Sequence, residues 1–258
     1  MKDILINAEK PMLRRPGIFD ALEGLAAAES TRHGGVSRAP YDTLNLGKST
    51  DDNPAAVAEN RRRFCAALGF RPDQTAWSKQ VHGDQVRVVT EPGGAEGFDA
   101  LITNVPGILL CVSVADCTPI LVFDDKNKAI AAIHAGWRGT VAEIVLKTLQ
   151  KMQTIYGTQG ADCVAFVGTC IDLCSFEVGD EVAAEFAPAF KQFNETRGKY
   201  FVDLKAANAA QLRAFGVPGT QIEISPFSTV LHVEDYFSHR MEKGITGRMQ
   251  GAIGMLSS

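Results

Sequence analysis

The chain has 258 residues, of which 45% are hydrophobic and 22% charged, and its formal net charge at pH 7 is −4. A chain of this size can bury a hydrophobic core without disulfide bonds, although its length alone would also allow two domains. The charges are mixed along the sequence, so there is no electrostatic footprint for nucleic acid or for an acidic membrane surface.

Targeting and membrane signals are missing from the sequence. Charged residues in the first twenty positions exclude an apolar signal core, and no uninterrupted apolar run is long enough to span a bilayer. We therefore expect a cytoplasmic protein whose six cysteines stay reduced and serve as core residues, metal ligands or reactive thiols. No repeat, low-complexity tract or linker divides the chain, so we expect one domain over residues 1–258.

The first third of the chain predicts a loop, a helix and two short strands. Residues 31–47 form a polar segment with several glycines, typical of a loop. A helix is expected to begin at Asn53, which caps its N-terminus ahead of a proline, and to end at Gly69. Two strand-like stretches within residues 76–90 flank His82.

The middle of the chain predicts buried strands followed by a long helix. Hydrophobic runs at 108–114, 120–123 and 129–133 are almost continuous, which is typical of strands buried on both faces. Apolar residues from Val141 to Ile155 then recur at helical spacing until Gly157. The remaining expected elements are a strand at 163–167, helices at 180–190 and 204–215, and a strand at 222–225. This order predicts a mixed α/β architecture.

Three residues with metal-binding side chains lie at the edges of expected strands: His82, Cys117 and His134. Two imidazoles and one thiolate suit zinc, and three protein ligands leave a fourth coordination position for water or substrate. The three residues are far apart in the chain and form no local metal-binding motif. The alternative is that Cys117 is a buried apolar residue and that the histidines are hydrogen-bonded at strand ends.

The hexapeptide HAGWRG at 134–139 joins an expected strand to an expected helix. Its two glycines permit an unusual turn or a close approach of the backbone. Arg138 beside a helix N-terminus would suit an anion and can hold phosphate through two parallel hydrogen bonds. Alternatively, Trp137 is a packing residue and Arg138 a solvated surface charge.

Short motifs follow one another in order through nearly the whole chain. They are GGVS at 34–37, LNLG at 44–47, ENR at 59–61, QVHG at 80–83, DALIT at 99–103, ADC at 115–117, PI at 119–120, HAGWRG at 134–139, EVG at 177–179, FS at 237–238 and TGR at 246–248. Together these motifs resemble the YfiH family. Its members are also described as purine nucleoside phosphorylases, laccase-domain proteins or peptidoglycan editing factors.

The resemblance implies a four-layer α/β/β/α sandwich with mixed sheets and a metal ion held by His82, Cys117 and His134. It also implies phosphorolysis of adenosine, inosine and S-methyl-5′-thioadenosine, together with adenosine deamination. We therefore expect one catalytic zinc ion, with copper as the alternative, and purine nucleosides and inorganic phosphate as ligands of a monomer or homodimer. Departures from the family pattern at 168–174, 228–229 and 237–241 spare the metal ligands and concern substrate preference.

Several other residues are candidates for the reaction. Besides Cys117 and His134, the catalytic candidates are Arg138 for phosphate and Glu177 as a proton donor. Glu177 is alternatively a carboxylate at a helix N-terminus. Asp116, next to Cys117, is a candidate for orienting a metal ligand. The candidate substrate contacts, each of which could instead make a structural hydrogen bond or salt bridge, are Asn45, Arg61, Arg138, Arg240 and Arg248.

Other functions compete with this interpretation. Multicopper oxidases need many histidines, and this chain has five with no His-x-His pair, which leaves only a single-copper polyphenol oxidase activity. A second possibility is a hydrolase of peptidoglycan precursors, cysteine- or metal-dependent; in the cysteine form Cys117 is the nucleophile and His134 its base. A third is a non-catalytic binding protein. Cys170 and Cys174 suggest a second metal or redox site, although two buried thiols are the commoner explanation.

Overall fold

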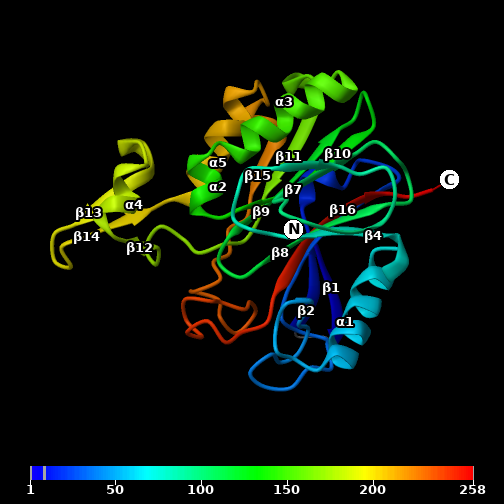
Figure 1. Cartoon of the computed structure of the whole chain (residues 1–258), viewed down its shortest axis with the longest axis horizontal. Coiled ribbons are helices and arrows are strands. Elements are labelled where there is room, and N and C mark those ends of the chain that lie inside the picture. The colour runs from blue at the N-terminus through cyan, green and yellow to red at the C-terminus, as the bar shows by residue number, and fades with distance from the viewer. Residues whose placement is uncertain (1, 8–9, 258) are drawn as a thin grey trace.

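The computed structural model describes the backbone of residues 2–7 and 10–257, and the side chains of residues 12–257. Within these residues the largest sheet has seven strands (Figure 1). In spatial order they are β1 (Lys2–Asn7), β2 (Lys10–Arg15), β3 (Leu25–Ser30), β16 (Met249–Met255), β8 (Leu109–Val114), β4 (Thr75–Lys79) and β6 (Gly93–Glu96).

Two further sheets complete the strand content of the described chain. The six-stranded sheet has the order β15 (Ile222–Ile224), β11 (Cys163–Val167), β9 (Thr118–Asp124), β10 (Ala129–Ala135), β7 (Ala100–Thr103) and β5 (Val86–Val88). The three-stranded sheet has the order β12 (Glu177–Val178), β14 (Lys199–Val202) and β13 (Lys191–Asn194). Both large sheets are mixed, since β4 pairs in parallel with β8 and β5 pairs in parallel with β7.

Helices cover the outer faces of the two stacked sheets, and one short helix packs against the three-stranded sheet. The helices are α1 (Pro54–Ala67), α2 (Trp137–Val141), α3 (Ile144–Tyr156), α4 (Asp180–Ala184) and α5 (Leu204–Ala214). Helix α1 packs on the seven-stranded sheet, whereas α3 and α5 pack on the six-stranded sheet (Figure 1). The predicted α/β/β/α sandwich is therefore confirmed. Short 3-10 turns occupy Gly17–Phe19, Pro72–Gln74, Gly160–Asp162, Pro188–Phe190 and Gly219–Gln221.

The alternation of side chains along β10 determines which residues face the core between the sheets. Ala131 and Ile133 pack toward α3, whereas Ile130 and Ala132 pack between the two large sheets. Because successive side chains of a strand point to opposite faces, His134 falls on the same face as Ile130 and Ala132. The C-terminal end of β10 therefore places the imidazole of His134 at the end of the core between the sheets.

Most sequence-predicted elements are confirmed. The three hydrophobic runs form β8, β9 and β10, and every residue of β9 and β10 is buried. The side chain of Asn53 accepts a hydrogen bond from the Ala55 N–H at the start of α1, and Gly69 has φ +81° just after its end. The expected helix from Val141 is instead divided into α2 and α3, because Glu143 lies in the left-handed region with φ 59°.

A second predicted helix also needs correction, and some strands were not predicted at all. The helix expected at 180–190 ends at Ala184, since Pro188 lacks an N–H group and begins a separate 3-10 turn. Several strands were not expected, including β16, which lies in the middle of the seven-stranded sheet. No helix in the described part of the chain combines the length and the apolar character that crossing a bilayer requires.

Candidate metal centre

Three segments of the chain converge at one end of the inter-sheet core. His82 lies on the connection from β4 to β5, and Cys117 lies on the connection from β8 to β9; both connections cross from the seven-stranded to the six-stranded sheet. His134 is in β10. The potential ligand atoms of these three residues all lie within 4.8 Å of one another. The structure thus brings together the three residues that the sequence singled out as metal ligands.

The β9–β10 hairpin explains why Cys117 and His134 meet. In its antiparallel register His134 is opposite Pro119 and Ala135 is opposite Thr118, so Cys117 stands at the end of β9 beside His134. The His82 ring completes the group, with its centroid 4.8 Å from that of His134 and the ring planes at 79°. His134 is buried, Cys117 is partly buried and His82 is exposed, so the group is open to solvent on the His82 side.

A buried carboxylate, that of Asp99, holds both histidines. Its Oδ1 accepts hydrogen bonds from Nδ1 of His134 at 2.8 Å and from the His82 N–H at 2.9 Å. Its Oδ2 accepts from the N–H groups of Gly83 at 2.8 Å and Val81 at 3.2 Å. Burial raises the pKa of Asp99, but the hydrogen bonds from His134 and the backbone outweigh burial and lower it. Asp99 is therefore an anion at neutral pH, and Nε2 is the nitrogen that His134 has left for a ligand.

Cys117 and His134 form an ion pair when no metal is bound. Burial alone would raise the pKa of the Cys117 thiol, but His134 and His82 outweigh it and lower the pKa to about 6. Burial would lower the pKa of His134, whereas Cys117 and Asp99 raise it to about 9. At pH 7 the sulfur is thus a thiolate, the form of cysteine that binds metals.

The glycines of the HAGWRG motif make room for this group. A Cβ atom on Gly136 would lie 3.0 Å from Cδ2 of His82 and 3.1 Å from Sγ of Cys117. A Cβ atom on Gly139 would lie 3.0 Å from the carbonyl oxygen of Gly83. Either side chain would therefore push the ligands or their loop apart. Two imidazoles and one thiolate at this separation fit a metal ion of borderline softness.

A cavity of about 560 Å³ opens beside the three residues. Asp116 supplies the one carboxylate among its described lining residues, whereas many of the others are cationic. The cationic lining residues are Lys48, Arg61, Lys79, Arg138, Arg240 and Arg248. Trp77, Trp137 and Phe176 add aromatic walls. This lining suits a ligand that combines an anion with a flat ring.

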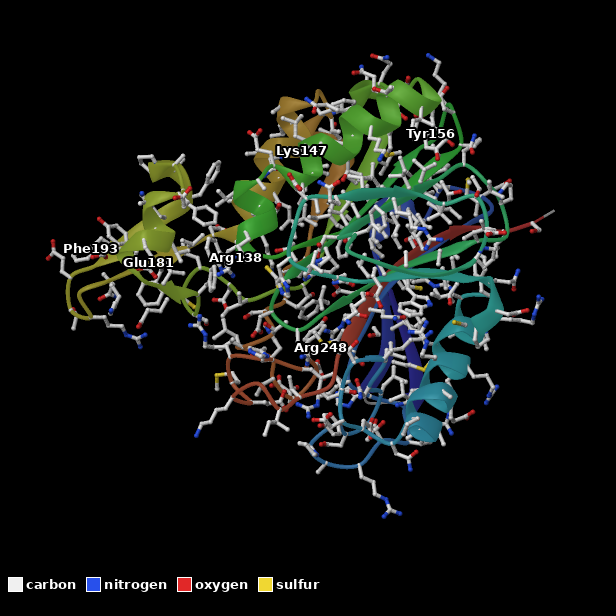
Figure 2. The ribbon with its side chains drawn as sticks, in the orientation of Figure 1. Arg138, Lys147, Tyr156, Glu181, Phe193 and Arg248 are labelled. Carbon is white, nitrogen blue, oxygen red and sulfur yellow. The ribbon has the colours of Figure 1, made fainter. Side chains whose placement is uncertain are left out.

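The four arginines that were predicted as substrate contacts line the cavity, and they differ in whether their guanidinium groups already donate hydrogen bonds within the chain. Arg138 is exposed and stacks on Trp137, with its Cζ 4.2 Å from the ring centroid, and its guanidinium makes no hydrogen bond or ion pair within the described chain. Arg61, Arg240 and Arg248 each donate to backbone carbonyl groups. Figure 2 shows Arg138 on α2 and Arg248 near the start of β16. Arg138 therefore has the most donors available for a ligand.

Sequence reasoning missed Asp99, Lys48 and Trp77 as contributors to the site. Nζ of Lys48 lies 3.8 Å from the centroid of the Trp77 ring. Burial, and next the nearby Arg61, lower the pKa of Lys48. Lys48 directly follows the LNLG motif and Asp99 opens the DALIT motif. Their positions beside these motifs are the signal that could have found them.

Three predicted residues have other roles in the structure. Asn45 is buried and does not line the cavity; its amide donates to Thr50 and Asp52, and its carbonyl accepts the N–H groups of Gly47 and Arg248. It shapes the loop that carries Lys48.

Glu177 also lies outside the described lining residues, so the structure does not bring this expected proton donor to the metal ligands. Its carboxylate is 3.6 Å from Nη1 of Arg197. Asp116 accepts hydrogen bonds from the hydroxyls of Thr229 and Ser238 and from the Arg240 N–H. It anchors the C-terminal loops, and the carboxylate that orients a metal ligand is that of Asp99.

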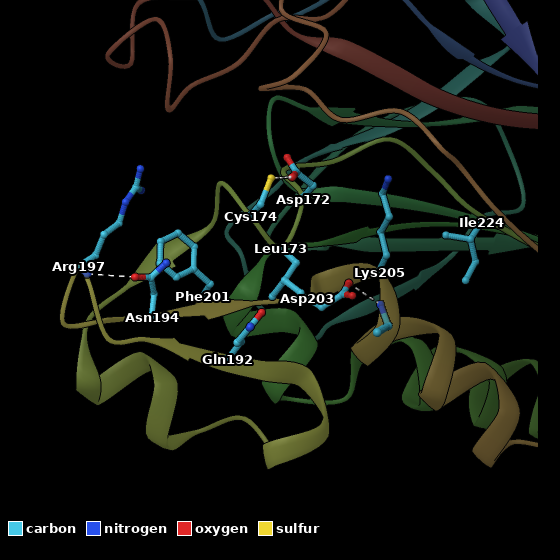
Figure 3. A pocket seen from close by; sticks show the side chains of 11 residues that line it. Asp172, Leu173, Cys174, Gln192, Asn194, Arg197, Phe201, Asp203, Lys205 and Ile224 are labelled. Carbon is cyan, nitrogen blue, oxygen red and sulfur yellow. Dashed lines mark hydrogen bonds between the residues drawn. The ribbon is translucent and has the colours of Figure 1, made fainter.

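A second cavity, of about 620 Å³, includes Cys174 and has none of the three metal ligands among its described lining residues (Figure 3). The Cys174 thiol is exposed and donates to Oδ2 of Asp172 at 2.6 Å. Cys170 is buried, which raises its pKa to about 12. The expectation of two buried thiols is therefore confirmed for Cys170 and wrong for Cys174.

Comparisons with known proteins agree on one family. The family model described as "Multi-copper polyphenol oxidoreductase laccase" matches residues 26–256. A Deinococcus radiodurans protein named purine nucleoside phosphorylase is 42% identical, over 95% of this chain and 93% of its own. A protein of the same name from Bacteroides thetaiotaomicron is 38% identical, over 97% and 98%.

Solved structures share the fold as well. The crystal structure of YlmD from Geobacillus stearothermophilus superposes with a TM-score of 0.90 and 32% identity, covering 99% of this chain and all of YlmD. The match extends through both sheets and the connections that carry His82 and Cys117. The chain is a member of the YfiH family of laccase-domain enzymes.

Proposed function

We propose that this protein is a zinc-dependent purine nucleoside phosphorylase that cleaves adenosine, inosine and S-methyl-5′-thioadenosine with inorganic phosphate. One observation carries the proposal: a His–Cys–His group lies on the wall of a cavity whose charged lining is almost entirely cationic. The names of the relatives point to the same reaction. The cavity volume of about 560 Å³ is in the ordinary range for a small-molecule site.

His82, Cys117 and His134 would hold the ion, the last through Nε2. Their mixed nitrogen and sulfur donors favour zinc, with copper as the alternative. When bound, zinc supplies a Lewis acid at the cavity wall. The free thiols of the described chain agree with a reducing compartment, so we propose that the protein acts in the cytoplasm.

The reaction needs a phosphate oxygen to bond to C1′ of the ribose while the bond from C1′ to the purine nitrogen breaks. Arg138 is placed to hold the phosphate, because its guanidinium has free donors in a planar fork. Arg61, Arg240 and Arg248 add positive potential around it. The same potential lowers the energy of the negative charge that develops on the departing base. Trp77, Trp137 and Phe176 offer apolar faces for the purine.

Adenosine deamination has weaker support at this site. The leaving ammonia needs a proton donor, and the carboxylate among the described lining residues, Asp116, already accepts three hydrogen bonds from the C-terminal loops. We therefore propose phosphorolysis as the main activity and deamination as a minor one.

A thiol hydrolase is the competing function, because the Cys117 thiolate is paired with an imidazolium and resembles an activated nucleophile. Such an enzyme would be inactivated by alkylation of Cys117 and would need no metal. Cys174 is also exposed and would react with the same reagent, so the alkylation is best carried out on a Cys174→Ala variant.

The decisive experiment measures metal content by mass spectrometry together with a nucleoside panel, with and without phosphate. We expect one zinc ion per chain and release of free base only when phosphate is present, with ribose 1-phosphate as the second product. Chelation should abolish the activity and zinc should restore it. The thiol mechanism would be correct instead if the purified protein is active without metal and alkylation abolishes the activity of the Cys174→Ala variant.

A further inference from the structure

Asp99 contacts two of the three metal-ligating segments at once. The residue is 1% exposed and directly precedes β7. Its backbone joins the same segments, because its carbonyl accepts the His134 N–H at 2.7 Å and its own N–H donates to the Gln85 carbonyl at 3.0 Å. Its side chain and main chain therefore both bridge β10 and the connection that carries His82.

On the His82 side, the carboxylate fills a small anion-binding nest of backbone N–H groups. Val81, His82 and Gly83 all point their N–H groups at the two carboxylate oxygens, at 2.8–3.2 Å. His82 has φ 60°, in the left-handed region that a histidine seldom adopts. Converging N–H groups around such a residue are a recurrent anion site in proteins. Here the anion belongs to the chain itself and stabilises the turn that presents the His82 ring.

On the His134 side, the same carboxylate selects one nitrogen of the ring. Nδ1 donates to Oδ1 of Asp99 at 2.8 Å, so the proton of a neutral ring is on Nδ1 and the lone pair is on Nε2. The four contacts leave neither oxygen of Asp99 unpaired. A buried anion with four donors is rigid, and it transmits that rigidity to both rings.

We propose that Asp99 is a positioning residue that presets both histidine ligands, His82 and His134, before the metal ion binds; this inference rests on the proposed function. Preset ligands bind more tightly because the ion does not have to order them. Loss of such an outer hydrogen-bond partner typically costs metal sites about 10- to 100-fold in affinity. If the carboxylate served only the fold, its loss would instead lower the stability of the metal-free and the metal-loaded protein equally.

The test uses Asp99→Asn, which keeps the size of the side chain but turns one oxygen into an N–H donor. If the amide nitrogen takes the place of Oδ1, His134 and the His82 N–H lose their acceptor. If it takes the place of Oδ2, the N–H groups of Val81 and Gly83 lose theirs. The matched control is Asp124→Asn. Asp124 is equally buried and also accepts two backbone N–H groups, at the opposite end of β9.

Zinc affinity is measured by competition with a chromogenic chelator, and thermal unfolding is followed with and without zinc. We expect Asp99→Asn to bind zinc about 10- to 100-fold more weakly and to lose most of the rise in Tm that zinc gives the unaltered protein. Asp124→Asn should keep both the zinc affinity of the unaltered protein and the rise in Tm on zinc binding. Unchanged affinity in Asp99→Asn, or an equal loss in Asp124→Asn, would overturn the positioning role while leaving the metal site intact. No zinc binding by the unaltered protein would overturn the proposed function as well.

A measurement on the native sequence guards against a variant that fails to fold. In protein loaded with ¹¹³Cd²⁺ and labelled with ¹⁵N-histidine, we expect cadmium coupling to Nε2 of His134 and a proton on Nδ1. Cadmium coupling to Nδ1 would refute the proposal, because that nitrogen would no longer be available to Asp99.

Discussion

The two ends of the β9–β10 hairpin use the same structural device for different purposes. At the turn, the buried carboxylate of Asp124 accepts the N–H groups of Lys126 and Asn127 and the side-chain amide of Asn127. At the open end, the buried carboxylate of Asp99 accepts three N–H groups and an imidazole. The decisive difference is the side-chain donor, which is an amide at the turn and, at the open end, an imidazole that can bind a metal. A loop-closing carboxylate becomes part of a functional site when one of its partners is itself reactive.

The largest effect should come from removing a ligand at the open end. We expect Cys117→Ala to weaken zinc binding about 100- to 1,000-fold, because apparent binding free energies of roughly 10–16 kcal/mol for four-ligand zinc sites correspond to about 3 kcal/mol per ligand. Phosphorolysis should fall with it. Competition titrations and kcat/KM check this, with Cys174→Ala as the control. Equal affinity in both variants would remove Cys117 from the metal site.

Lowering the pH should weaken zinc binding at the open end in two steps. Cys117 has a lowered pKa of about 6 and His134 a raised pKa of about 9, so this pair holds one proton between those values. Metal binding displaces that proton, and affinity should rise about tenfold per pH unit in this window. Below pH 6 the thiol is protonated too, and the slope should steepen to about a hundredfold per unit. Zinc titrations from pH 5 to pH 9 measure the slope; a flat profile would contradict the ion pair.

A substitution at the turn end of the hairpin should lower the stability of the fold and leave the activity unchanged. We expect Asp124→Asn to lower the free energy of unfolding by about 1–3 kcal/mol, the usual cost of leaving a buried polar group without its partner. Urea unfolding measures this, and nucleoside cleavage at a permissive temperature should stay unchanged. A parallel loss of activity would mean that the two ends of the hairpin are coupled.

The smallest effect is expected just beyond the open end, at the exposed Arg138. Arg138→Ala should raise the KM for phosphate about tenfold, since an exposed charge contributes less than the roughly 1.5–3 kcal/mol of a buried charged hydrogen bond. Zinc content should be unaffected. Arg197→Ala, an exposed arginine at the other cavity, is the matched control. An unchanged KM would indicate that Arg240 or Arg248 holds the phosphate instead.

The sequence predicted the strands that carry the site because their hydrophobic runs are continuous, and it predicted the ligands because their motifs are distinctive. It did not predict the role of Asp99, because three of its four partners are backbone N–H groups that any residue could supply. Glu177 was expected near the ligands, but its position depends on the three-stranded sheet, whose short polar strands leave little sequence pattern.

The strand β16 was missed for a different reason. Gly251 and Gly254 lie in its interior, where glycine normally weakens a strand. Here a Cβ on Gly251 would lie 2.7 Å from Cβ of Pro119, and a Cβ on Gly254 would lie 2.7 Å from Cζ of Phe70. Close packing against other elements thus demands glycine, and that demand is visible only once the sheets are stacked.

The positions of His82 and Cys117 on two connections that cross between the sheets have a mechanical consequence. An ion held by both residues and by His134 would cross-link the two halves of the sandwich where two of the connections between the sheets meet. Separation of the sheets would then require the ion to leave first. The metal-loaded protein is therefore expected to unfold far more slowly than the metal-free protein, as a measurement of unfolding rates in denaturant would show.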